Sequence, residues 1–455
     1  MDIESIRRAS KASKLKHLGE IHTSWYGLKY VSSCRPPDEG RVRDLPYMIG
    51  FSILGPLLTA FLQMVLEKVR EHEIQMIMFP AREGFILHSL FDRLRPVILP
   101  NTTVRGEYVF LTRKSTYLAS IHQIGSRELA MGLWTQVPTL QTMLTRFSLE
   151  PTDFADIAAA CSLPLDERLK GEDEPRLLNF VLHPETVKRL RQKQIIKREL
   201  LKRYLGQIGF WDFERVAFVD IGWNGTTQDA LTNAFMDEPQ WPKFFGWYMG
   251  YNPMNANIST PKSTYEGLVF EKGRHGQHRS GMCRFPELFE MATRAAHATT
   301  VDLQEDCNTG EIYPVFSPES SASRQAELSD RKLITSIQTG IFDFSDAFVK
   351  DAAVNDHNLK ALCDYACEAT DQFLRYPPAI VSHALTNFSH SEDFGTDIVI
   401  RHQKKALRIW NPINWFQGRR NQPRLLWVEC ALAQHGVPAL VGLYNLYRAL
   451  RWRSY

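Results

Sequence analysis

The stretch Val216-Ala-Phe-Val-Asp-Ile-Gly-Trp-Asn-Gly-Thr-Thr-Gln228 decides the fold. Its first four residues are apolar or small and predict a short buried strand that ends at Asp220. A small polar loop follows and leads into a helical pattern. Backbone N–H groups, hydroxyls and a helix dipole suit a phosphate group, so we expect Gly225, Thr226 and Thr227 to bind one. Asp220 would then hold a sugar diol or a metal ion beside the phosphate, although the same pattern also ends ordinary α/β strands.

The composition is that of an ordinary globular chain. With 455 residues it is long enough for a large core and for two or three domains or subdomains. Hydrophobic residues at 44% and charged residues at 23% exclude wholesale disorder and a coiled coil. The formal net charge of +3 is too small to indicate nucleic acid, so no nucleic-acid partner is expected.

The cysteines and the first residues indicate where the chain works. Seven cysteines at scattered positions do not form a disulfide framework and favour a reducing cytoplasm. Cys363 and Cys367 lie one helical turn apart, but no second pair at zinc spacing accompanies them, so we do not expect a structural metal there. The first residues lack the pattern of a signal peptide. We therefore expect a cytoplasmic protein.

Three more strands are predicted beside the first. Residues 74–79 are apolar, end in Pro80-Ala-Arg-Glu-Gly84 and precede a helical pattern. Residues 108–111 end in a polar, basic loop that contains Arg113 and Lys114, and residues 244–251, rich in aromatic residues, form a fourth strand. Strands separated by helical stretches predict an α/β fold with a mainly parallel sheet, whose ligands bind at the carboxyl ends of the strands. The three polar loops should then face one crevice.

We expect the chain to fall into a few regions. These are a lead-in at 1–45, an α/β core at 46–305 with a helical insertion at about 127–209, a linker or exposed turn region at 308–330, and a helical C-terminal region at 331–455. Residues 45–66 carry no charge and are long enough to span a bilayer. Glycine, proline and polar residues dilute this stretch, and a charged helical end leads from it into a strand, so a buried helix is favoured.

Three basic stretches leave alternatives open. The amphipathic pattern at 184–204 favours a solvated helix face over a surface for an acidic partner. The glycine-rich, cationic loop at 271–281 either closes over a phosphorylated ligand or is a surface loop. The aromatic and arginine-rich end at 437–455 either rests on an anionic membrane surface as a peripheral contact or packs on the preceding domain.

Taken together, the three loops resemble the ligand frame of type I phosphoribosyltransferases, which use 5-phosphoribosyl-1-diphosphate (PRPP). The resemblance implies a sheet of that kind, here with large helical insertions and a helical C-terminal region. It also implies the substrate-binding residues, which are Arg82, Gly84, Arg113, Lys114, Gly222, Asn224, Gly225, Thr226 and Thr227. The loops at residues 82–84 and 113–114 would hold the pyrophosphate, and the loop at 222–227 would hold the ribose 5-phosphate. Mg²⁺ is implied as the cofactor, bound with the donor and by Asp220.

The chain departs from that family beside Asp220. A second acidic residue usually follows, whereas Ile221 stands here, and Gly222-Trp223-Asn224 is unusual filler. This departure points away from a nucleobase acceptor.

A closer resemblance extends over residues 47–418. Leu54-Gly-Pro-Leu-Leu58, Phe79-Pro-Ala-Arg-Glu-Gly84 and Val219-Asp-Ile-Gly-Trp-Asn-Gly225 are similar to the module found beside haloacid-dehalogenase-type phosphatases in bacterial polysaccharide loci. That resemblance implies transfer of a 5-phosphoribosyl group from PRPP to a lipid-linked or polymeric glycan, such as O-antigen or capsule. A phosphatase then removes the 5-phosphate to leave ribofuranose. No Asp-x-Asp nucleophile motif occurs near this N-terminus, so the phosphatase is expected to be a separate protein.

The chemistry requires a base, because a sugar hydroxyl is a poor nucleophile. Glu83, Asp220 and Glu287 are the candidate catalytic carboxylates, and the sequence does not choose among them. Attack opposite the leaving group predicts a β-linked product. The competing hypotheses are a glycosyltransferase that uses a nucleotide sugar and a non-catalytic PRPP-binding protein.

Overall fold

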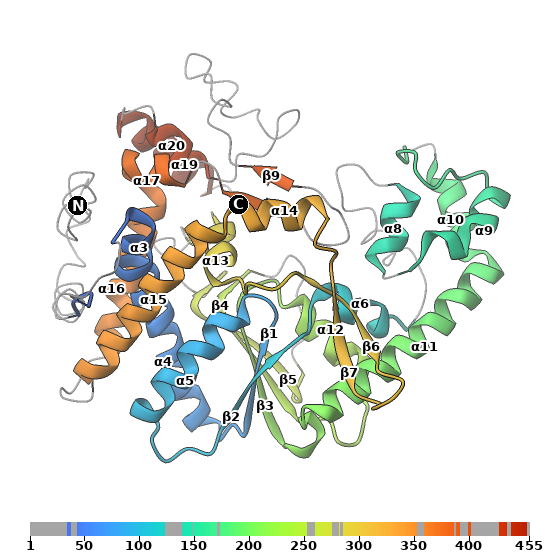
Figure 1. Cartoon of the computed structure of the whole chain (residues 1–455), viewed down its shortest axis with the longest axis horizontal. Coiled ribbons are helices and arrows are strands. Elements are labelled where there is room, and N and C mark those ends of the chain that lie inside the picture. The colour runs from blue at the N-terminus through green and yellow to red at the C-terminus, as the bar shows by residue number, and fades with distance from the viewer. Residues whose placement is uncertain are drawn as a thin grey trace.

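A five-stranded sheet lies at the centre of the protein in the computed structural model (Figure 1). The structure describes residues 34–37, 43–122, 139–147, 149–170, 173–252, 260–274, 282, 285–352, 359–385, 388–391, 399–401, 427–434 and 438–452. The strands of the sheet are β1 (Met76–Pro80), β2 (Arg105–Val109), β3 (Arg215–Trp223), β4 (Lys243–Tyr251) and β5 (Ser263–Glu271). They run in the order β2-β1-β3-β4-β5, and every pair is parallel. The expected α/β fold with a parallel sheet is confirmed.

Both faces of the sheet are buried, because successive side chains point to opposite faces of each strand. In β1, Met76 and Met78 belong to one apolar cluster, whereas Ile77 and Phe79 belong to another. β3 and β4 alternate between the same two clusters. This explains why the central strands read as continuous apolar runs instead of alternating polar and apolar residues.

Helices cover each face. The cluster that contains Ile77 and Phe79 is completed by α4 (Gly55–Glu71), α5 (Gly84–Ile98), α13 (Pro286–Thr293), α15 (Arg331–Ala352) and α16 (Leu359–Arg375). The cluster that contains Met76 and Met78 is completed by α6 (Arg113–Ser120), α11 (Pro184–Gln207), the short 3-10 turn η4 (Phe210–Asp212) and α12 (Thr226–Phe235). Because α15 and α16 lie in the same core as the sheet, much of the helical region after residue 331 belongs to the body of the α/β core.

The long apolar stretch is a buried helix. One continuous helix is formed by α3 (Leu45–Ile49), the π-helical turn η1 (Gly50–Leu54) and α4. It is long and apolar enough to cross a membrane, but 89% of its most apolar stretch is buried within the protein. Glycines let α15 approach closely: a Cβ on Gly50 would lie 2.0 Å from the carbonyl oxygen of Ile337, and one on Gly340 would lie 2.2 Å from that of Tyr47. The residues that dilute this stretch therefore serve helix packing.

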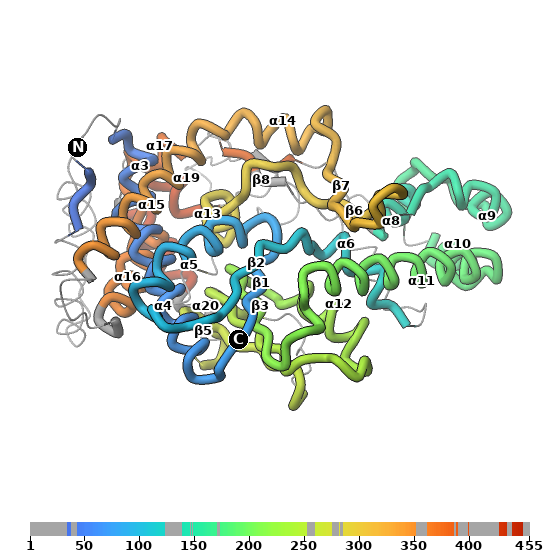
Figure 2. Tube along the Cα trace, turned by 60° about the horizontal axis from the view of Figure 1, so that its bottom comes forward, coloured from blue at the N-terminus to red at the C-terminus, as the bar shows by residue number. Residues whose placement is uncertain are grey.

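The insertion between β2 and β3 is helical where it is described. It contains α8 (Leu140–Arg146), η2 (Pro151–Phe154), α9 (Ala155–Ala160) and α10 (Glu174–Leu182), which have an apolar cluster of their own. These helices lie at the outer end of α11 (Figure 2). The basic residues of α11 form ion pairs within the chain, for example Arg189 with Asp156 and Lys202 with Glu238. This supports the expectation of a solvated helix face.

The expected linker at 308–330 is wrong. β7 (Ile312–Phe316) pairs antiparallel with β6 (Thr300–Glu305), and α14 (Ala322–Ser329) follows. Pro314 is tolerated because this sheet has only two strands, and the Ser321 hydroxyl accepts a hydrogen bond from the Arg324 N–H and caps α14. Ser321 thus marks the start of a helix, whereas Pro314 lies within a strand.

The C-terminal part is made of short elements. These are α17 (Ala379–Ala384), β8 (Ser389–Ser391), β9 (Val399–Arg401), α19 (Val428–Ala433) and α20 (Pro438–Trp452). α20 packs on α19 through Val441 but leaves Leu443 and Leu446 exposed. The predicted lead-in at 1–45 and the cationic loop at 271–281 lie largely outside the described residues.

Candidate functional site

The chain reverses direction across the sheet between β1 and β3. From β1 it moves outward to β2, and it then returns to place β3 on the other side of β1. α5, which follows β1, packs on one face, and α12, which follows β3, packs on the opposite face. In doubly wound sheets, ligands bind beside the carboxyl ends of the strands at such a switch point. The loops after β1 and β3 therefore form the candidate site.

The loop after β1 is compact. Gly84 begins α5 where a Cβ would lie 2.6 Å from the carbonyl carbon of Phe79, so no larger residue fits. The Ala81–Arg82 peptide bond is cis. The Glu83 carboxylate is half-buried and accepts a hydrogen bond of 3.1 Å from the Arg82 backbone N–H. Glu83 therefore lies at the carboxyl end of β1, partly accessible to solvent.

The side chain of Arg82 is buried against a carboxylate that the sequence did not indicate. Arg82 Nη1 lies 2.6 Å from Glu327 Oε1. Arg294 Nη1 lies 3.3 Å from the same oxygen, and Arg324 Nη1 lies 3.5 Å from Glu327 Oε2. All four side chains are at least nine-tenths buried. Three guanidinium groups thus surround one carboxylate beside the β1 loop.

This cluster is rich in positive charge. Burial acts to raise the pKa of the Glu327 carboxyl, but Arg82, Arg294 and Arg324 outweigh burial and hold that pKa below its usual range. Burial in turn lowers the pKa of Arg294. Its Nη2 is buried with no hydrogen-bond partner among the described residues. The arginines therefore have capacity for a further anion.

Asp220 lies within β3, which continues to Trp223, and its carboxylate is half-buried. Its Oδ1 accepts a hydrogen bond of 2.7 Å from the Ile221 N–H. Burial and the Glu83 carboxylate nevertheless raise the pKa of Asp220 to about 8, while Arg113 opposes them. The two candidate carboxylates and the candidate cation therefore lie within electrostatic range of one another.

The last residues of β3, which follow Asp220, are held in place by contact with β4. Gly222 has a φ of 130°, and a Cβ there would lie 2.1 Å from the carbonyl oxygen of Gly250. The Gly222–Trp223 peptide bond is cis. The Trp223 ring occupies the space that a Cβ on Gly250 would need and lies 5.9 Å from the ring of Phe289. The Trp223 side chain therefore packs against β4 and α13.

The predicted phosphate loop forms the start of α12. Gly225 is its N-cap with a φ of 70°, and no side chain caps the helix there. Thr226 and Thr227 follow in the first turn, and Asn224 precedes the cap, half-buried. The first N–H groups of a helix have no partner within the helix, so this turn has the donors that a phosphate needs.

The loop after β2 carries the basic residues. Thr112 caps α6, since its hydroxyl accepts a hydrogen bond from the Ser115 N–H. Arg113 and Lys114 are therefore the first two residues of α6, with Arg113 exposed and Lys114 half-buried. Their position places two cations at the carboxyl end of the sheet, as the sequence predicts.

α13 completes an acidic wall. Burial, Glu83 and Glu287 raise the pKa of Glu290 to about 8, and Asp220 adds to the shift. The structure therefore places Glu290 within electrostatic range of Glu83, Asp220 and Glu287, and Glu287 lies one turn before it on the same helix. Among the described residues, no group of three histidine, cysteine or acidic side chains is arranged to hold a metal ion.

Two residue sets decide the electrostatics of the site. Asp220, Glu83, Glu287 and Glu290 form the acidic wall, and Arg82, Arg294 and Arg324 around Glu327 form the basic cluster. Sequence reasoning missed the basic cluster, because α14 lies in the stretch expected to be a linker. Ser321 as a helix cap, with Arg324 and Glu327 three residues apart in the helix that follows, was the available signal.

No protein-family model matches this chain, and no curated protein is similar to it in sequence. The case for a function therefore rests on the site itself: carboxylates, guanidinium groups and an open helix N-terminus at the switch point of a parallel sheet.

Proposed function

We propose that this protein transfers a 5-phosphoribosyl group from PRPP to a hydroxyl of a bacterial glycan. One observation carries the proposal: β1 and β3 are neighbours at the switch point, and Glu83 after β1 acts electrostatically on Asp220, which precedes the start of α12 by a few residues. PRPP has two phosphate-bearing ends and a diol between them. The candidate site offers cations, carboxylates and helix N–H groups, which are the three kinds of group that these parts of PRPP require.

The residues divide among the parts of the donor. Thr226 and Thr227 in the first turn of α12, with Gly222, Asn224 and Gly225 leading into it, would hold the 5-phosphate. Asp220 would accept hydrogen bonds from the ribose hydroxyls. Arg82, Arg113 and Lys114, with the backbone of Gly84, would neutralise the diphosphate. Binding at both ends would orient the reacting carbon between them.

The reaction balances without an oxidant or a covalent intermediate. The bond from C1 to the diphosphate oxygen breaks, and both electrons leave with pyrophosphate. A glycan hydroxyl oxygen forms the new bond to C1, and its proton passes to a carboxylate. Positive charge develops on the ribose as the bond breaks, and the acidic wall would stabilise it.

The raised pKa values of two carboxylates affect their protonation state and so their capacity to act as the base. Asp220 and Glu290, with pKa values of about 8, are largely protonated at neutral pH in the free protein. A Mg²⁺ ion that arrives with the donor and lies beside these carboxylates would favour their ionised forms. The base is therefore proposed to be Glu83, Asp220 or Glu287, with Glu290 controlling the charge around them.

Mg²⁺ is proposed as the cofactor, arriving with the diphosphate. This ion takes oxygen ligands and commonly binds through one or two carboxylates together with substrate phosphates. The Asp220 carboxylate at the acidic wall is a donor of this type. The ion would supply charge neutralisation for the departing pyrophosphate.

The proposed partners follow from the reaction. The acceptor is a lipid-linked or polymeric glycan, and a separate phosphatase of the haloacid-dehalogenase type removes the 5-phosphate from the product. The exposed Leu443 and Leu446 on α20 support a peripheral contact with the inner face of the membrane, in a protein that is otherwise cytoplasmic.

A donor screen tests the proposal. The full chain is incubated with a panel of bacterial glycans and with either radiolabelled PRPP or radiolabelled nucleotide sugars. Label transferred from PRPP alone supports the proposal. Label transferred from a nucleotide sugar but not from PRPP would replace it with a nucleotide-sugar glycosyltransferase, and PRPP binding without pyrophosphate release would indicate a non-catalytic binding protein.

A further inference from the structure

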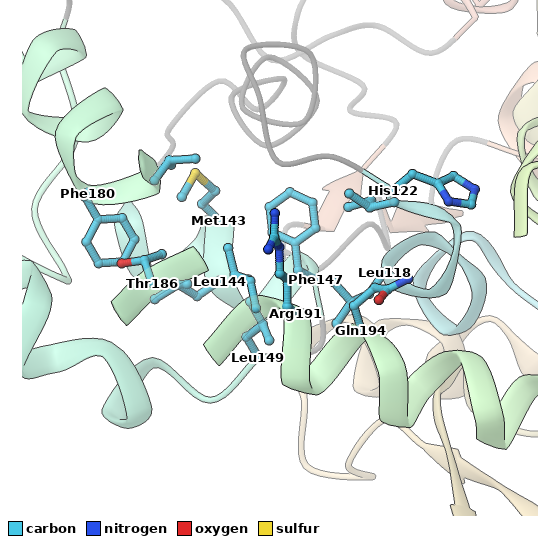
Figure 3. Close-up of a pocket in the computed structure, with 13 residues that line it drawn as sticks. Leu118, His122, Met143, Leu144, Phe147, Leu149, Phe180, Thr186, Arg191 and Gln194 are labelled. Atoms are coloured by element: carbon cyan, nitrogen blue, oxygen red, sulfur yellow. The ribbon is translucent and has the colours of Figure 1, made fainter. Parts of the chain in front are cut away.

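A hollow lies between α6 and the helical insertion, away from the candidate site (Figure 3). The hollow and its open mouth together contain about 670 Å³ of space that no protein atom fills, part of it open solvent. Its wall is mainly apolar and includes Leu118, Met143, Leu144, Phe147 and Phe180. Leu118 lies toward the end of α6, and α6 spans about 12 Å from its start at Arg113. The hollow and the candidate site are therefore at opposite ends of one helix.

One polar group in the wall lacks a partner. Thr186 lies in the first turn of α11, is fully buried and lines the hollow. Its hydroxyl has no hydrogen-bond partner among the described residues. A buried hydroxyl without a partner is unfavourable, so most such groups in folded proteins are satisfied. A ligand oxygen in the hollow would satisfy this one.

A cation borders the same hollow. Arg191 is exposed and lies beside the ring of Phe147 in Figure 3. Its neighbours on α11 are paired, Arg189 with Asp156 and Lys193 with Asp153. In the part of the chain that the structure describes, no ion pair involves Arg191. The border of the hollow is thus complementary to a negative charge.

We propose that this hollow binds an anionic amphiphile with an apolar body. Its carboxylate or phosphate pairs with Arg191, its hydrocarbon body lies against Leu144 and Phe180, and an oxygen at its far end bonds to the Thr186 hydroxyl. Positions 186 and 191 are separated by about 7.5 Å along the helix axis, a span that a chain of roughly eight carbon atoms covers. The proposal does not depend on the function of the candidate site.

Calorimetry with two matched probes tests the proposal. Octanoate and 8-hydroxyoctanoate are titrated into the full chain at neutral pH. Both should bind, and the hydroxylated probe should bind more tightly by roughly fivefold, because it alone satisfies Thr186. No binding of either probe, or equal affinity for both, would overturn the assignment.

Four variants separate the contacts. Thr186→Val keeps the shape of the side chain and should abolish the preference for the hydroxylated probe without weakening octanoate. Arg191→Gln should weaken both probes, whereas Lys188→Gln, one turn earlier on the same helix, should weaken neither. Leu190→Trp should fill the hollow and remove binding. An unchanged preference in Thr186→Val, or equal effects of Arg191→Gln and Lys188→Gln, would contradict the proposal.

Discussion

Nη1 of Arg82 donates a hydrogen bond of 2.6 Å to Oε1 of Glu327, a residue 245 positions further along the chain. The bond ties the loop after β1 to α14, which packs outside the parallel sheet (Figure 1). Glu327 also faces Arg294 and Arg324. One carboxylate therefore holds the proposed diphosphate-binding arginine in place.

Glu327→Gln should destabilise the protein strongly. The substitution leaves three buried guanidinium groups without their shared carboxylate, and breaking a buried ion pair costs about 3–5 kcal/mol. Urea unfolding measures the change. Glu305→Gln is the control, because its pair with Arg203 is exposed and contributes little to stability. Equal losses in the two variants would show that the buried cluster does not stabilise the fold.

The stability of the free protein should fall as pH rises. Burial and Glu83 raise the pKa of Asp220 to about 8, so the folded protein binds a proton that the unfolded chain releases near its ordinary value of about 4. This contribution is complete below the unfolded pKa and is lost as pH rises through about 8. Thermal unfolding in Mg²⁺-free buffers should show a decline in Tm with pH that is smaller in Asp220→Asn. The exposed Asp237→Asn should follow the wild type; parallel curves for all three proteins would refute the prediction.

Gly222→Ala should disrupt the turn after Asp220. Its φ of 130° is unfavourable for alanine, and the added Cβ would lie 2.1 Å from the Gly250 carbonyl oxygen. We expect a loss of at least about 2 kcal/mol in the free energy of unfolding. Gly442→Ala, in the interior of α20 with nothing within 4 Å of the added carbon, should instead stabilise by about 0.5–1 kcal/mol. A neutral Gly222→Ala would mean that this turn is not constrained.

Arg113→Gln should weaken PRPP binding. Arg113 is exposed at the start of α6, and its charge lowers the pKa values of Asp220 and Glu290 against burial. Losing one charge-assisted contact to the diphosphate should reduce affinity by at least roughly tenfold. Calorimetry with PRPP and Mg²⁺ measures this. Arg93→Gln, whose partner is Asp346 on α15, provides a control that should keep wild-type affinity.

Local patterns predicted four of the five strands of the sheet, and β5 was not among them. The apolar run that begins at Val216 identifies β3, because a strand buried on both faces has a continuous apolar signature. β2 was expected at 108–111 and lies at Arg105–Val109, since an edge strand tolerates Arg105 and Glu107 that disguise its start. The β1 and β3 loops could be placed because parallel strands align their carboxyl ends.

The basic cluster could not be predicted in this way. The partner of Arg82 is distant in sequence, and no spacing rule links the two residues. The serine- and proline-rich stretch around α14 suggested a linker, although Ser321 there is a helix cap. Likewise, the raised pKa of Asp220 depends on burial and on Glu83 from another strand loop, which only the folded arrangement supplies.

The most direct measurement is mass spectrometry of a glycan acceptor after incubation with PRPP, Mg²⁺ and the full chain. We predict an added phosphopentose in β linkage, with one pyrophosphate released for each group transferred. Asp220→Asn should abolish this product while keeping the wild-type circular dichroism spectrum. Undiminished activity in Asp220→Asn would remove Asp220 from the site. The proposed function would be contradicted if the wild-type protein modified no glycan with PRPP as the donor but did transfer a sugar from a nucleotide sugar.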